Sequence, residues 1–337
     1  MSLVEYPLAE ILTLNGGRTV EWEAVGSGPP LMWVEGGPGL WAHLARPDVE
    51  LVSDLFRCHL VNAPGCGRTS APANVTGYDL TGIIAFFEEV RERLGLGQVT
   101  VMGHSWGGLV AAAWAAGHPE SVGRLVVIDG YPGGYEGSGS AVDHSAADAE
   151  RDRAYARHAG EPWYDAAVRA LADADDEEWD EETWIARFDP AWPMYFADPG
   201  SPLAVPHLER VRAEVRSNRA MSNAWFGGVH HFDHIDILPS LAEVKCPSLV
   251  IAGQYDFHLR ASVEPADRGS DSGCALYRDR GLGSHPAVRA ARCFSGHAAR
   301  LVGRDLRSVS HSDTAGGQCQ RDLVSHGGIR HPTVRAR

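Results

Sequence analysis

The chain has 337 residues, of which 44% are hydrophobic and 22% charged, and its formal net charge at pH 7 is −14. This composition is typical of a globular protein with a sizeable core. The negative charge disfavours nucleic acid as a partner, because phosphates would be repelled. We see no apolar run of the roughly 18–20 residues that cross a bilayer, and no secretory signal pattern. We therefore expect a cytoplasmic protein that binds neither nucleic acid nor membrane, while its oligomeric state stays open.

Strand and helix signals alternate over the first 130 residues. Apolar runs predict strands at 18–24, 30–34, 57–62, 99–102 and 124–128. Helical spacing predicts helices at 79–94, where Asp79 is the expected cap, and at 105–117. Continuous apolar strands separated by helices indicate a parallel sheet that is covered on both faces.

The sequence changes character after residue 130. Residues 131–228 are acidic, rich in Trp and helical in pattern, and a further buried strand is expected at 247–252. We expect this stretch to be a helical cap inserted into a sheet domain. The domain would comprise residues 1–130 and 229–300, and residues 301–337 are expected to be disordered.

The segment Gly103-His104-Ser105-Trp106-Gly107 follows the apolar run VTVM and precedes LVAAAWAA. A serine on a sharp strand-to-helix turn projects its hydroxyl clear of the backbone, and glycines on either side avoid a collision across the turn. The field at the N-terminus of the helix favours developing negative charge. We therefore predict Ser105 as a nucleophile, with the backbone N–H of Trp106 as an oxyanion donor.

At GHSWGG (103–108), GGPG (36–39) and GQYD (253–256) the chain resembles the α/β-hydrolase superfamily. It is most similar to the proline iminopeptidase-like branch. The resemblance implies the α/β-hydrolase fold, with a mostly parallel sheet, helices on both faces and an inserted helical cap. It implies a second oxyanion donor at the Gly37 N–H and neither a cofactor nor a metal. Glu35 stands where the branch has His, which alters the rim of the site.

The triad order on this fold is Ser, then Asp or Glu, then His. Asp256 follows the strand expected at 247–252 and is the first choice for the acid, with Asp129 as the second. His285 is the predicted base and His297 its rival. The histidine cluster at 230–234 has the look of a metal site, but we do not assign a metal to it because the resembled family needs none.

The chain departs from this pattern after about residue 265. Residues 257–337 carry 13 Arg against 7 Asp+Glu, and we recognise no strand before His285 and no amphipathic helix after it. We hypothesise a one-base frameshift near Pro265-Ala266. Back-translating residues 266–294 and stepping one base gives, with suitable codons, LTAARIADALYTVIEDSGHIPQFEQPDAF, which has the helix, strand, Ser-Gly-His and closing helix of the family.

These residues together predict a serine hydrolase that cleaves an ester or amide bond through an acyl-enzyme, as an aminopeptidase of the prolyl type would. An esterase or lactonase acting on a small metabolite is the alternative within enzymes, and a non-catalytic, tail-damaged relative that only binds a ligand is the alternative outside them. The substrate would be a small molecule or short peptide. Glu35, Trp192 and Trp225 are candidates for contacting it, although packing within the cap also explains the tryptophans. Epoxide and haloalkane hydrolysis are disfavoured, because those relatives use Asp at the elbow.

Overall fold

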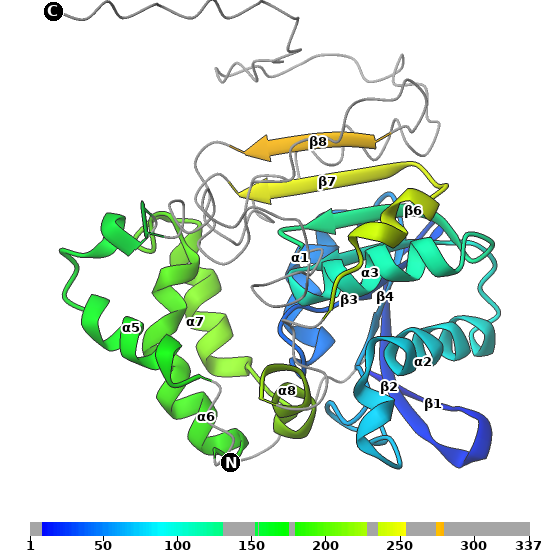
Figure 1. Ribbon diagram of the computed structural model, residues 1–337, viewed down its shortest axis with the longest axis horizontal. Helices are drawn as coiled ribbons and strands as arrows, with labels where there is room; N and C mark the ends of the chain where they lie inside the picture. Colours follow the sequence, from blue (N-terminus) through cyan, green and yellow to red (C-terminus); the bar gives the residue numbers. More distant parts are fainter. Residues whose placement is uncertain are drawn as a thin grey trace, which may run out of the picture.

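The computed structural model describes residues 9–130, 152–153, 155–174, 179–227 and 235–253, together with the backbone of 274–279. Within this part of the chain the strands are β1 (Glu10–Thr13), β2 (Thr19–Gly26), β3 (Pro30–Val34), β4 (Arg57–Val61), β5 (Val99–His104), β6 (Val122–Ile128), β7 (Ser248–Gly253) and β8 (Cys274–Asp279). They form a sheet of eight described strands in the order β1-β2-β4-β3-β5-β6-β7-β8 (Figure 1).

The sheet is mostly parallel, as the sequence predicted. Only β1 with β2, and β2 with β4, pair antiparallel among the described strands, and β3 to β8 pair in parallel with their neighbours. One expectation was wrong. We recognised no strand before His285, but the backbone of β8 pairs with β7 from Ser248 opposite Cys274 to Gly253 opposite Asp279. Hydrogen bonding to the edge of β7 can hold such a segment in the sheet even where its side-chain pattern is weak.

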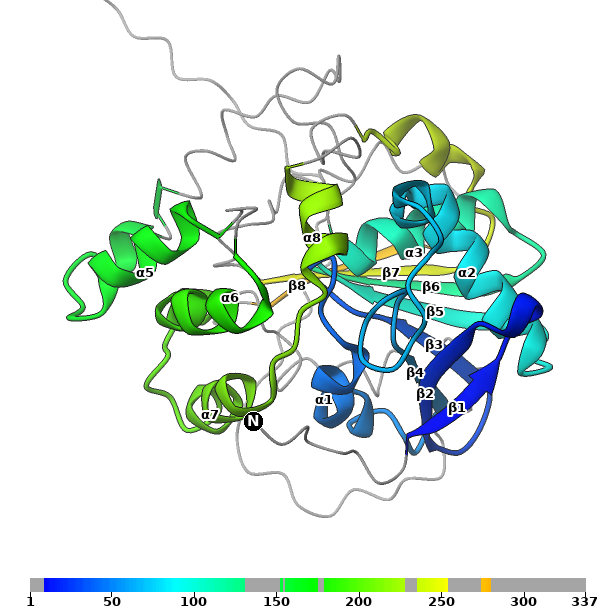
Figure 2. The same ribbon diagram turned by 90° about the horizontal axis from the view of Figure 1, so that it is seen from below.

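Helices cover both faces of the sheet. Helices α2 (Leu80–Arg93) and α3 (Trp106–Gly117) lie on one face and α1 (Arg46–Glu50) on the other (Figure 2). Successive side chains of β3 point to opposite faces of the sheet. Met32 and Val34 belong to the larger of two clusters of buried hydrophobic residues, and Leu31 and Trp33 belong to the smaller one. The uninterrupted apolar run of β3 therefore reflects burial on both sides.

Local signals account for where these helices begin. Asp79 accepts a hydrogen bond from the Gly82 N–H at 2.6 Å and thus caps α2, as predicted. Helix α3 is rich in Ala and is buried along most of its length, because it packs directly on β5 and β6. A helix so deeply buried fixes the position of its N-terminus, and Ser105 immediately precedes it.

A helical insertion separates β6 from β7. It contains α5 (Tyr164–Ala172), α6 (Glu181–Phe188), α7 (Ala204–Glu214) and α8 (Arg219–Phe226), with a 3-10 helix at Asp189–Tyr195. Figure 1 shows α5, α6 and α7 beyond the carboxyl ends of β7 and β8. The boundaries expected for a cap, at residues 131 and 228, fall outside the described residues, as does the tail at 301–337, so the division into domains stays a prediction. Of the described helices, none has the length and apolar character required to cross a bilayer.

Candidate active site

Ser105 sits on a sharp turn between β5 and α3. Its backbone has φ 54° and ψ −120°, a conformation that side-chain-bearing residues rarely adopt. The Ser105 N–H donates to the carbonyl of Ile128, at the end of the neighbouring strand β6, at 2.9 Å. The residue is half-buried, so its hydroxyl lies neither in the core nor in open solvent. This is the geometry that the sequence predicted for a serine elbow.

The glycines around Ser105 are needed for close packing. A Cβ at Gly103 would lie 2.0 Å from the carbonyl oxygen of Gly107, and a Cβ at Gly107 would lie 2.1 Å from that of Val34. Both separations are far below any normal contact. The turn can therefore form only because neither residue carries a side chain.

The loop after β3 lies beside the serine. Strands β3 and β5 pair so that Val34 is opposite Gly103, which brings the start of the GGPG loop to the elbow. A Cβ placed on Gly36 would come within 3.2 Å of the Ser105 Cβ. Gly37 has φ +54°, and its carbonyl accepts from the Leu40 N–H at 2.9 Å, which closes the loop into a turn.

Two predicted oxyanion donors thus belong to segments that meet at Ser105. Trp106 is in the first turn of α3, where backbone N–H groups have no acceptor within the helix. Gly37 is in the loop that packs against the elbow. Their roles as oxyanion donors stay predictions.

Glu35 is engaged at the base of this loop. Its carboxylate accepts from the Gly36 N–H at 2.7 Å and from the Trp33 indole N–H at 3.1 Å. It also lies 3.9 Å from Nδ1 of His104, and its side chain is only 11% exposed. Glu35 therefore shapes the start of the GGPG loop, and its predicted contact with a substrate stays a prediction.

Ionisable groups of α1 and of α7 in the insertion interact with His104, beside the elbow. Burial raises the pKa of Asp48 in α1 to about 7, although Arg210 of α7 acts in the opposite direction. Burial lowers the pKa of His207 in α7 to about 4, and positive charge on Arg210 and His104 lowers it further. Arg210 also donates a hydrogen bond to the carbonyl of Leu44. Sequence analysis missed these residues, because only the packing of α7 brings them near the elbow.

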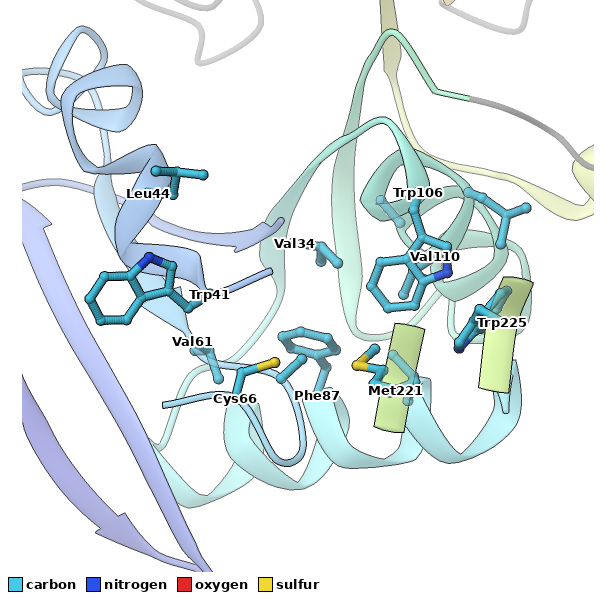
Figure 3. Close-up of a cluster of buried hydrophobic side chains, with 14 of the residues drawn as sticks. Val34, Trp41, Leu44, Val61, Cys66, Phe87, Trp106, Val110, Met221 and Trp225 are labelled. Carbon is cyan, nitrogen blue, oxygen red and sulfur yellow. The ribbon is translucent and has the colours of Figure 1, made fainter. Parts of the chain in front are cut away.

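The two tryptophans expected to contact a substrate are buried. Trp225 of α8 packs edge-on against Trp106 with ring centroids 5.1 Å apart, beside Met221 (Figure 3). Its indole N–H donates to the Tyr78 carbonyl at 2.6 Å, and its side chain is 0% exposed. Trp192 packs on Phe188 with centroids 5.0 Å apart. These contacts agree with the packing interpretation, and a role in substrate contact stays a prediction.

Of the remaining predicted site residues, only Asp129 lies in the described part of the chain. Asp256, His285, its rival His297 and the cluster at 230–234 lie outside the described residues. Asp129, the second choice for the acid, follows β6 with φ 44° and is 2% exposed. In the described part of the chain, no three His, Cys, Asp or Glu side chains are grouped so as to hold a metal ion.

Comparison with known proteins gives a family match and several distant relatives. The family described as "alpha/beta hydrolase fold" matches residues 29–258. The chain is 36% identical over 112 residues to a proline iminopeptidase of Neisseria gonorrhoeae, covering 32% of this chain and 35% of that protein. It is 31% identical over 121 residues to a cis-3-alkyl-4-alkyloxetan-2-one decarboxylase of Shewanella oneidensis, covering 35% and 37%. The aligned part thus spans about a third of these curated relatives.

Solved structures match over a longer stretch at lower identity. An α/β-fold hydrolase from Bacillus anthracis str. Sterne matches with a TM-score of 0.66 at 19% identity, over 87% of this chain and 98% of that one. The proline iminopeptidase of Mycobacterium smegmatis matches with a TM-score of 0.59 at 17% identity, over 87% and 98%. At this identity the likeness establishes the fold alone.

Proposed function

Because the chain belongs to the α/β-hydrolase family, we propose that it hydrolyses an ester or amide bond through an acyl-enzyme formed on Ser105. The observation that carries the proposal is the backbone of Ser105, at φ 54° and ψ −120° between β5 and α3. A serine held in this conformation has no structural advantage over glycine, and its use is to present a hydroxyl.

The proposed reaction begins when the Ser105 oxygen attacks the substrate carbonyl and its proton passes to an imidazole, assigned to His285. The carbonyl oxygen becomes an oxyanion and accepts hydrogen bonds from the N–H groups of Gly37 and Trp106. The same imidazole returns the proton to the leaving group, and water then releases the acyl product. Asp256 would orient the imidazole and stabilise its charged form.

The proposed substrate is a small molecule or short peptide. Relatives named proline iminopeptidase support an aminopeptidase of the prolyl type. Other relatives are named epoxide hydrolase, among them a mouse protein 31% identical over 117 residues. A serine at position 105 favours acyl transfer over that chemistry, because a serine adduct with an epoxide would be an ether that water does not readily cleave.

The test is covalent labelling with a fluorophosphonate, read by mass spectrometry of the Ser105 peptide. We expect one label per chain in the unchanged protein and none in Ser105→Ala. If the folded protein does not label at Ser105, the acyl-enzyme proposal fails and a ligand-binding relative without catalysis is favoured.

Turnover then distinguishes the two enzyme classes. We expect faster release of p-nitroaniline from a prolyl substrate than release of p-nitrophenol from short esters, with both abolished in Ser105→Ala. Turnover of the esters alone would assign the esterase or lactonase alternative instead.

A further inference from the structure

Asn218 lies where the helical insertion returns to the sheet, at the N-terminus of α8. Its side-chain oxygen accepts from the N–H groups of Ala220 at 3.2 Å and Met221 at 3.5 Å, so it caps that helix. A capping role uses the oxygen of the amide and leaves its NH₂ group for other partners.

That NH₂ group reaches across to the sheet domain. It donates to the carbonyl oxygen of Pro64 at 3.1 Å and to the hydroxyl of Tyr78 at 3.2 Å. Both partners are more than 130 residues away along the chain. The side chain therefore joins the first turn of α8 to the loop after β4 and to the segment before α2.

The backbone of the same residue holds the loop beside Ser105. The Asn218 N–H donates to the Gly39 carbonyl at 2.7 Å, and Ser217 forms an isolated antiparallel bridge with Leu40. Leu40 in turn donates to the carbonyl of Gly37. One short path of hydrogen bonds thus runs from Asn218 to the residue proposed as an oxyanion donor.

The contact has little room to shift. A Cβ on Gly39 would lie 2.5 Å from the Asn218 carbonyl oxygen, and a Cβ on Gly65 would lie 2.4 Å from its side-chain nitrogen. Both glycines also have positive φ, at 99° and 77°. Two loops therefore close tightly around this single residue, which fixes where each can lie.

We propose that Asn218 is a positioning residue for the oxyanion loop: by joining the loop at 37–40 to the loop after β4 and to Tyr78, it holds the Gly37 N–H where the oxyanion forms. This rests on the proposed function. The loop has to be held more closely in the transition state than in the substrate complex, because the oxyanion exists only there. A change at Asn218 is therefore expected to lower kcat and the rate of acylation rather than to raise KM.

The test compares Asn218→Ser with the unchanged protein on a p-nitrophenyl ester and a fluorophosphonate. Serine keeps a capping oxygen for α8 but lacks the NH₂ group. The matched control is Asn15→Ser, the same change at an exposed residue in the 3-10 turn between β1 and β2. A burst titration counts competent sites, so that kcat is expressed per working molecule.

We expect Asn218→Ser to lower kcat and the maximal labelling rate about 10- to 100-fold, because donor positions matter on the ångström scale. KM should stay within about twofold, as expected for an interaction needed only in the transition state. The control should keep wild-type values. Unchanged kcat per titrated site, or a higher KM at unchanged kcat, would overturn the proposal and leave Asn218 as a helix cap only.

A second variant keeps the test open if Asn218→Ser does not fold. Tyr78→Phe removes the hydroxyl that accepts from Asn218 but keeps the ring and the carbonyl that accepts from Trp225. We expect a fall in kcat of about 3- to 10-fold with KM unchanged, since one hydrogen bond of the set is lost; unchanged kcat in this variant counts against the proposal. If the unchanged protein neither labels nor turns over substrate, the proposed function fails and this inference falls with it.

Discussion

Gly107→Ala is the sharpest perturbation that the elbow offers. Gly107 lies in the first turn of α3, and a methyl group there would point at the end of β3. It would lie 2.1 Å from the carbonyl oxygen of Val34 and 2.6 Å from that of Glu35, whereas real Cβ atoms essentially never come within 3.0 Å of another heavy atom. Both obstacles are backbone atoms, so no side-chain rotation can make room.

The size of the effect follows from that geometry. The end of β3 and the start of α3 must separate by roughly an ångström, and a misplacement of that size in reacting groups costs about 10²-fold in rate. The two proposed oxyanion donors lie on the two segments that are pushed apart. We therefore expect kcat to fall at least about 10²-fold, together with about 1–3 kcal/mol of destabilisation from overpacking.

The assay is ester turnover per titrated site, with urea unfolding to measure stability. Gly117→Ala is the matched control, because Gly117 ends the same helix and a Cβ there would meet nothing within 4 Å. The control should be unchanged in kcat and equal or slightly higher in stability. A Gly107→Ala protein with wild-type kcat would refute the proposed placement of the oxyanion site between β3 and α3.

Three further predictions concern stability and the tail. Burial acts to raise the pKa of Glu88, but hydrogen bonds from Arg91, Trp114 and Ser121 together with the charge of Arg91 outweigh it and lower the pKa. Glu88→Gln should therefore have a free energy of unfolding about 1–3 kcal/mol lower than wild type at pH 7. Urea titrations at several pH values should show this difference fading as the pH falls below the ordinary pKa of 4.5. Burial raises the pKa of Asp48 to about 7, so the folded protein loses stability as the pH rises from 4 to 7. Asp48→Asn should be about 1–2 kcal/mol more stable than wild type at pH 8 and equal to it near pH 4, and parallel stability curves would contradict this. If the frameshift hypothesis is right and the tail as written does not hold His285 beside Ser105, the shifted reading over 266–294 should raise kcat about 10⁴- to 10⁶-fold, as expected when a missing triad member is restored. Equal rates, or a gene with an uninterrupted frame, would refute the hypothesis.

Much of the sheet could be predicted from the sequence, because buried parallel strands carry their own signal. The run at 30–34 became β3 without any change of bounds, and Asp79 caps α2 as expected. The elbow at Ser105 was predictable because it needs glycines at fixed offsets. Each of these features is set by residues that are near one another in the chain.

The surroundings of the elbow could not be predicted in the same way. Asn218 donates a hydrogen bond to Pro64, 154 residues away in the chain, and the Trp106 ring contacts Trp225 only because α8 packs beside the start of α3. Such contacts depend on the path of the insertion, which no local pattern fixes. Strand β8 was missed for a related reason. Backbone pairing with β7 holds it in the sheet, and its side-chain pattern alone does not indicate a strand.

The dihedral angles of Ser105 have a thermodynamic consequence. A non-glycine residue at φ 54° is held against its own preference by about 1–3 kcal/mol, and total domain stabilities are only about 5–15 kcal/mol. A sizeable fraction of the folding free energy of this chain is therefore absorbed by one backbone bend. The packing of β5, β6 and α3 has to offset this strain energy. Glycine at position 105 would raise the free energy of unfolding, but it would remove the hydroxyl proposed as the nucleophile.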